Sequence, residues 1–152
     1  MSCTIKRILV PVDFSAASRA ALWRAGELAG ELGASLDVLH VLDLPEAHHM
    51  ATEFYVPLPS EYREELHRAA EKRLEDWLNT ASGSPAAHHD LAEGTPAAEI
   101  VNYARHHADD MIVMGTHGRG GVSHLLLGSV AEKVVRTAPC PVLTVRAEEA
   151  AA

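Results

Sequence analysis

The sequence has little cysteine and no excess of basic residues. Its two cysteines, Cys3 and Cys140, are too few for a disulfide framework, so we expect reduced thiols and a cytoplasmic protein. Lys and Arg number 13 against 21 Asp and Glu, which gives a formal net charge of -8. This acidic balance argues against a broad surface for DNA or RNA, but it leaves room for a local basic spot that holds one small anion.

Long hydrophobic runs are also missing. The first apolar run, Ile8 to Val12, is stopped by Asp13 and is too short for the apolar region of a signal peptide. No stretch approaches the length needed to span a membrane, so membrane insertion is not expected. The chain has 152 residues, 47% of them hydrophobic and 22% charged, which suits one globular domain. We place this domain at residues 1–147, followed by a frayed tail at 148–152.

The chain alternates regularly between two periodicities. Short apolar, β-branched runs predict strands at residues 7–13, 35–43, 87–94, 110–115 and 141–145, the third of them a weaker strand at an edge. Apolar residues at helical spacing predict helices between Ser15 and Gly33, from Glu61 towards residue 80, from Thr95 and Pro96 onwards, and over residues 129–137. Residues 43–60 carry three prolines without a sustained period, and we interpret them as an irregular loop.

This order of elements predicts an α/β fold with a mostly parallel sheet and helices on both faces. In such open sheets, ligands bind beyond the carboxyl ends of the strands, where the strand order reverses. If the strands at 7–13 and 110–115 are neighbours at that point, Asp13 and the loop after Gly115 face one crevice.

That loop, MGTHGRGGVSHLLLGSV at residues 114–130, is rich in glycine. Gly115 and Gly118 permit positive φ and a close approach of backbone N–H groups to an anion. Gly128 and Ser129 open a helix whose free N–H groups favour a phosphate, and Ser129 adds a hydroxyl donor. Neither the P-loop spacing nor the dinucleotide fingerprint is present.

The same residues have a purely structural interpretation. The segment SVAE at 129–132 matches a capping box, in which Ser129 would satisfy the helix and bind no ligand. Glycine spacing alone leaves both interpretations open.

Several segments follow one another along the chain: ILVPVDFSAASRAAL, LHV at 39–41, EIVNYA at 99–104, DMIVMGTHGRGG and APCPVLTV, with Gly115-x-x-Gly118, nine residues, then Gly128-Ser129. In this order they resemble the universal stress protein family. The resemblance covers nearly the whole chain. It implies a Rossmann-like sheet of five strands in the order 3-2-1-4-5, and a homodimer joined through the last strand. Members with this glycine pattern typically bind ATP or another adenine nucleotide.

The resemblance also implies which residues would line the nucleotide. The ribose and adenine side would be Pro11, Val12 and Asp13, with the backbone of Val41 at the adenine edge, and the phosphate side would be Met114, Gly115, Gly118, Gly128, Ser129 and Val130. His117 and Arg119 lie inside the motif and are further candidates for phosphate contacts. Asp13 is a candidate ligand for a ribose hydroxyl or for a magnesium ion carried by the nucleotide. Thr95 stands where many relatives have an acidic residue, but threonine also caps helices.

Other conspicuous residues have ordinary structural explanations. We expect His40 to be a hydrogen-bonded core histidine, and Trp77 to be part of the core. The His-His pairs at 48–49, 88–89 and 106–107 point apart on a strand or helix. No Cys or carboxylate spacing completes a zinc site, so we expect no metal site formed by the protein alone.

These features favour a dimeric nucleotide-binding stress-response regulator, with an unidentified protein partner, over an enzyme. No general base accompanies Ser15, Ser123 or Ser129 in the sequence, and the SGG loop of related adenylating enzymes is replaced by PVDFS. Two alternatives stay open: a ligand-free interaction module of the same fold, and a slow ATPase or autophosphorylating protein.

The last predicted strand carries the dimer hypothesis. An apolar edge strand invites aggregation unless another chain covers it. We therefore expect a two-fold pair joined along Pro141, Val142, Leu143, Thr144 and Val145.

Overall fold

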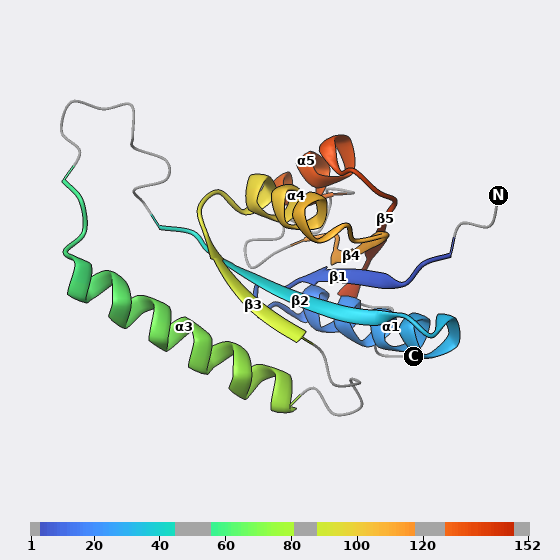
Figure 1. Ribbon diagram of the computed structural model, residues 1–152, viewed down its shortest axis with the longest axis horizontal. Helices are drawn as coiled ribbons and strands as arrows, with labels where there is room; N and C mark the ends of the chain where they lie inside the picture. The colour runs from blue at the N-terminus through green and yellow to red at the C-terminus, as the bar shows by residue number, and fades with distance from the viewer. Residues whose placement is uncertain (1–3, 45–55, 81–87, 118–126, 148–152) are drawn as a thin grey trace.

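The computed structural model describes residues 4–44, 56–80, 88–117 and 127–147. In these ranges five strands form one sheet between two layers of helices (Figure 1). The strands are β1 (Arg7–Pro11), β2 (Ser35–Leu42), β3 (His88–Glu93), β4 (Met111–Gly115) and β5 (Val142–Val145). All pairings are parallel, and the order is β3-β2-β1-β4-β5, which confirms the predicted α/β Rossmann-like fold. The predicted weak strand is indeed an edge.

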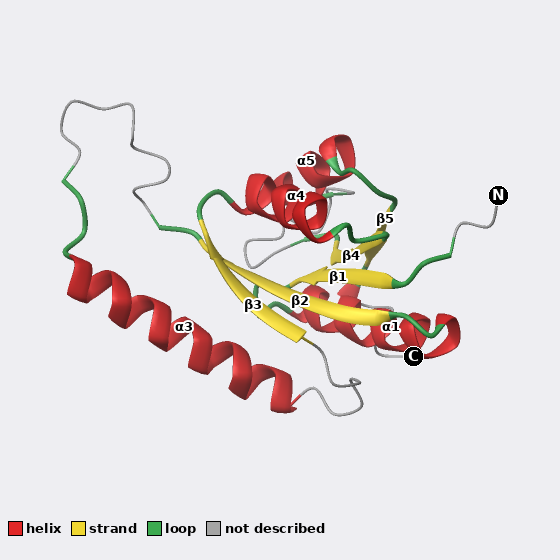
Figure 2. Cartoon of the chain, viewed as in Figure 1, coloured by secondary structure: helices red, strands yellow, loops and turns green. Residues whose placement is uncertain are grey.

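Over the described ranges, four helices cover the sheet; Figure 2 draws them in red. They are α1 (Ala16–Leu32), α3 (Ser60–Thr80), α4 (Pro96–His107) and α5 (Ser129–Thr137). The hydrophobic core explains their placement, because side chains alternate across each strand. Ile8 and Val10 pack with α1 and α3 on one face, whereas Leu9 packs with α4 and α5 on the other. Trp77 is 9% exposed and belongs to the first core, as predicted.

Local capping chemistry sets several helix ends. The Ser15 hydroxyl accepts a hydrogen bond from the backbone N–H of Ser18 at 3.1 Å and so caps α1. Gly33 ends the same helix in the left-handed conformation, with φ 65°. The sequence predicted a helix between these same two residues. Thr95 does occupy the N-cap position of α4 with Pro96 next, but its side chain makes no capping hydrogen bond.

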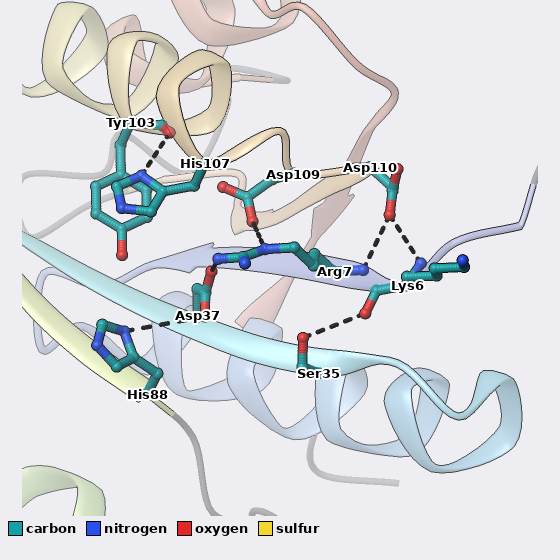
Figure 3. Close-up of polar contacts among 9 residues, drawn as sticks. All are labelled: Lys6, Arg7, Ser35, Asp37, His88, Tyr103, His107, Asp109 and Asp110. Atoms are coloured by element: carbon teal, nitrogen blue, oxygen red, sulfur yellow. Dashed lines mark hydrogen bonds and ion pairs between the residues drawn. The ribbon is translucent and has the colours of Figure 1, made fainter.

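The amino-terminal ends of the strands carry a polar cluster, which we call the Arg7 cluster (Figure 3). The Arg7 guanidinium on β1 pairs with the Asp37 carboxylate on β2, and its Nε lies 3.5 Å from Oδ1 of Asp109, just before β4. Both carboxylates are buried. On the other side, Asp110 accepts hydrogen bonds from the backbone N–H groups of Lys6 and Arg7 at 2.8 and 3.0 Å. The cluster ties β1, β2 and the start of β4 together.

The Arg7 cluster holds one carboxyl group whose titration is strongly perturbed. Burial, and then the negative charge of Asp37, raise the pKa of Asp109 to about 6. Tyr103 of α4 lies beside the cluster, with its ring stacked on that of His107. Burial also raises the pKa of the Tyr103 hydroxyl.

Candidate functional site

A cavity of about 860 Å³ lies at the carboxyl ends of the strands, the opposite end of the sheet from the Arg7 cluster. Its walls come from the ends of β1, β2 and β4, the beginnings of α1, α4 and α5, and one face of α3. The strand order reverses between β1 and β4, so the cavity opens where ligands bind in sheets of this kind.

The cavity brings together most of the residues singled out from the sequence. Lining it are Pro11, Val12, Asp13, Val41, Met114, Gly115, Gly128, Ser129 and Val130, together with His117. Gly118 and Arg119 lie outside the described residues. Segments more than a hundred residues apart in the chain therefore meet at one site. This is what the sequence predicts if β1 and β4 are neighbours in the sheet, and they are.

The turn after β1 is held by its own side chains. Oδ1 of Asp13 accepts a hydrogen bond from the backbone N–H of Ser15 at 3.0 Å, and the backbone N–H of Asp13 donates to the Ser18 hydroxyl at 3.4 Å. Between them, Phe14 adopts φ 66°, a left-handed conformation that is unusual for a non-glycine residue. Asp13 is thus a turn residue and also a half-buried wall of the cavity.

The start of α5 differs from the capping-box hypothesis. Gly128, not Ser129, is the N-cap, and no side chain caps the helix. The Gly128 carbonyl accepts from the N–H of Glu132 at 2.9 Å, while the Gly128 N–H donates to the Thr116 carbonyl at 2.6 Å. The interpretation of Ser129 as a cap is therefore wrong.

The first turn of α5 consequently faces the cavity with N–H donors that have no acceptor among the described residues. Helix geometry leaves the N–H groups of Ser129, Val130 and Ala131 without an intrahelical acceptor, and all three residues line the cavity. The positive end of the helix dipole lies at the same place. This combination suits an anion such as a phosphate.

Gly115 is required by packing rather than by backbone conformation. A Cβ atom at this position would lie 2.8 Å from the backbone carbon and the Cβ of Ala17 in the first turn of α1. Its φ is not in the positive range, so the positive φ that glycine permits is not used at Gly115. Glycine here allows β4 to approach α1 closely beside the cavity.

His40 combines the expected hydrogen bond with a second position in the cavity wall. Its Nδ1 lies 2.8 Å from the Val12 carbonyl oxygen, which confirms a hydrogen-bonded histidine. It is only half-buried, however, and its ring lies 4.5 Å from that of Phe14, centroid to centroid. Both rings line the cavity.

Sequence reasoning missed the contribution of α3 altogether. Leu66, Ala69, Ala70 and Arg73 face the cavity at spacings of three and four residues, which places them on one side of the helix. Leu66 and Ala70 are among the apolar residues whose helical spacing predicts this helix, and that series continues through Leu74. Arg73 lies next to the series, and no pattern in the sequence separates it from the other charged residues of the helix.

The charged groups around the cavity have mixed signs. Asp13 and Asp43 contribute carboxylates and Arg73 contributes a guanidinium. Over the described ranges, no group of three or more His, Cys, Asp or Glu side chains is arranged to hold a metal ion. The pairs His88–His89 and His106–His107 lie within those ranges, and the pair at 48–49 lies outside them. Nor is any described helix long and apolar enough to cross a membrane.

Comparison with known proteins is consistent along the chain. A model of the universal stress protein family matches residues 4–146. A universal stress protein of Methanocaldococcus jannaschii is 37% identical over 145 residues, which cover 93% of this chain and 82% of the relative. The solved structure of UspA from Lactobacillus plantarum has a TM-score of 0.74 at 28% identity, covering 93% of this chain and 98% of that one.

Two further solved structures carry nucleotides. One is a universal stress protein in complex with cAMP, with a TM-score of 0.61, 24% identity, and coverage of 95% of this chain and 98% of that one. The other is the protein from Archaeoglobus fulgidus in complex with dAMP, with a TM-score of 0.60, 24% identity, and coverage of 93% and 98%. At this level of identity the likeness shows a shared fold.

Proposed function

The chain belongs to the universal stress protein family, and from that premise we propose that it is a cytoplasmic stress-response regulator that binds an adenine nucleotide in the cavity between the ends of β1 and β4. One observation carries the proposal. The first turn of α5 turns the N–H groups of three residues towards the same cavity that Asp13 lines.

The phosphate end of the ligand belongs at α5. Ser129, Val130 and Ala131 supply backbone donors there, and Gly128 lines the cavity beside them. Met114, Gly115 and the motif residues Gly118 and Arg119 complete this side by family resemblance. The helix dipole favours negative charge at the same place. AMP, ADP and ATP all fit this chemistry, and Asp13 is the carboxylate that would hold a magnesium ion carried by ATP.

The nucleoside end belongs at β1 and β2. Asp13 would accept a hydrogen bond from a ribose hydroxyl, Pro11 and Val12 give an apolar surface, and the Val41 backbone would meet the adenine edge. Structural relatives in complex with cAMP and dAMP support an adenine nucleotide as the ligand class.

Calorimetry with AMP, ADP and ATP tests the proposal directly, together with mass spectrometry of any ligand that copurifies. Ser129→Pro is the informative variant, because proline suits the first helical position and removes only an N–H without an intrahelical acceptor. Gly128 before it has φ -72° and ψ 165°, which a following proline accepts. We expect AMP affinity to fall roughly tenfold in Ser129→Pro, because a charge-assisted hydrogen bond is lost. Ser129→Ala keeps the N–H and is the control.

Two results count against the proposal. One is a wild-type protein that binds no adenine nucleotide and carries none after gentle purification. The other is equal affinity in Ser129→Pro and wild type, which would remove α5 from the site.

We propose further that a second copy of the chain covers β5. The carbonyl groups of Pro141 and Val145 accept from β4-side N–H groups at 3.0 and 2.9 Å, so Val142 and Thr144 turn their backbone groups to the free edge. Leu143 is 38% exposed beside them. Light scattering at micromolar concentration should give the mass of a dimer for the wild type and of a monomer for Thr144→Pro, which lacks an outward N–H. A monomeric wild type contradicts this arrangement.

A further inference from the structure

One face of α3 forms the wall of the cavity next to β2. This helix packs against β2 and β3, at one edge of the sheet. Helix α5 packs against α4 and against β5, the strand at the opposite edge. Leu66, Ala69 and Ala70 make this wall apolar, and Arg73 adds one guanidinium to it. The wall therefore lies at the opposite end of the cavity from the N–H groups of α5.

The Arg73 guanidinium lies over the ring of Phe14. Its Cζ is 4.2 Å from the centroid of the Phe14 ring, within the range of a cation–π contact. The carboxylate three residues further along α3, Asp76, pairs with Lys72 at 3.2 Å instead. Arg73 is thus an exposed arginine that rests on an aromatic ring and lines the cavity.

The Phe14 ring is itself held firmly. Its backbone has φ 66°, and the hydrogen bond between Ser15 and Asp13 closes the turn around it. The ring packs at 4.5 Å against His40 and edge-on at 5.9 Å against Trp77. Unusual backbone conformations of this kind persist where the surrounding structure determines them, and they cluster at ligand sites. The support under Arg73 is thus preorganised.

Given the proposed function, on which this inference rests, we propose that Arg73 binds the nucleotide's base: its guanidinium plane, backed by Phe14, stacks on the purine. Stacking of bases on arginine planes is a recurrent mode of nucleotide recognition. The phosphates lie at α5, so the base is the part of the ligand that reaches the α3 wall. Arg73 then selects for a flat heteroaromatic group and is indifferent to the number of phosphates.

The test compares wild type, Arg73→Gln and Arg73→Lys by calorimetry with three probes: AMP, adenosine and ribose 5-phosphate. Lysine keeps the charge but lacks the plane. We expect both variants to lose roughly tenfold in affinity for AMP and for adenosine, and to bind ribose 5-phosphate as the wild type does. Arg68→Gln, an exposed arginine of the same helix that does not line the cavity, is the matched control and should bind all three normally.

Each other outcome has a distinct meaning. Wild-type affinity in Arg73→Lys, or a loss confined to the two phosphorylated probes, would show a charge contact and overturn the stacking role. Unchanged affinity in both variants would remove Arg73 from the site while the proposed function stands. A wild-type protein that binds neither AMP nor adenosine would overturn the proposed function, and this inference with it.

Discussion

Two polar regions lie at opposite ends of one sheet, and they differ in what their polar groups face. In the Arg7 cluster, a guanidinium and two buried carboxylates face one another. At the carboxyl ends, Asp13 and the first N–H groups of α5 face a cavity of about 860 Å³. Polar groups at strand ends therefore do not by themselves mark a binding site. What identifies a candidate site is a set of donors and acceptors that face a cavity.

The comparison predicts a clean separation of stability from binding. Asp37→Ala should lower the free energy of unfolding by about 2 kcal/mol, because it leaves the Arg7 guanidinium without its closest partner. The figure lies below the roughly 3–5 kcal/mol of a fully buried pair, since the Arg7 side chain is 40% exposed and solvent screens the pair. Urea denaturation measures it. AMP affinity should stay within twofold of wild type, and a large loss of affinity would show that the two ends are coupled.

Gly115 tests the comparison between the two ends of the sheet, because it lines the cavity but is required to be glycine by its packing against α1. Gly115→Ala should cost about 1–2 kcal/mol of stability, since the added Cβ meets Ala17 at 2.8 Å. The control is Gly30→Ala on α1, where a Cβ meets nothing within 4 Å. That control should stabilise the helix by up to about 1 kcal/mol. Thermal unfolding of the two variants should therefore shift in opposite directions.

Asp13→Asn should lower AMP affinity and leave folding stability nearly unchanged, which is the opposite of the effect expected for Asp37→Ala. The amide oxygen keeps an acceptor for the Ser15 N–H, so the turn and the folding stability should change by less than about 0.5 kcal/mol. AMP affinity should fall roughly tenfold, because the charged acceptor for the ribose is lost. Calorimetry and urea denaturation on the same sample distinguish the two effects. A destabilised variant with normal affinity would reduce Asp13 to a turn residue.

The smallest predicted effect is a pH dependence that belongs to the Arg7 cluster alone. The pKa of Asp109 is raised from 3.8 to about 6, by burial and then by Asp37, while Arg7 lowers it. Between these two values the native state binds this proton and the unfolded state does not, so this group's contribution to stability falls as pH rises through about 6.

Asp109→Asn removes that proton and isolates its effect. In the wild type, Asp109 raises the free energy of unfolding at pH 5 relative to pH 7. We expect Asp109→Asn to lack this contribution, so its stability at pH 5 relative to pH 7 should be lower than that of the wild type. Urea denaturation at the two pH values measures the difference. An identical pH dependence in both proteins would mean that Asp109 does not titrate in this interval. We also expect AMP affinity to be the same in Asp109→Asn and wild type, because the Arg7 cluster lies away from the cavity.

Much of the fold was predictable because its signals are local. The apolar runs of β1 and β4, the start of α1 after Ser15 and its end at Gly33 each depend on a few adjacent residues, and each was confirmed. The bounds of α5 were predicted to the residue. The N-cap residue of α5 was not predicted. Gly128 occupies that position and its N–H donates to the Thr116 carbonyl, a contact between residues that are twelve apart and that no local pattern contains.

The candidate site was predictable only in part, for the same reason. Family resemblance and the glycine motif indicated the β1 and β4 sides, and the structure brings those residues to one cavity. The α3 wall escaped notice because Arg73 meets Phe14 across 59 residues of sequence. Nothing in either segment alone identifies the other as its neighbour.

By itself, the sequence determined the order and type of the elements and the family, because periodicity, caps and motifs are written in short stretches of chain. Only the tertiary structure decided which polar groups close on one another and which stay open to a ligand. Asp13 and Asp37 both lie on or beside a strand and are alike in chemistry. The parallel order β3-β2-β1-β4-β5 sets Asp37 against Arg7 at one end and Asp13 against an open cavity at the other.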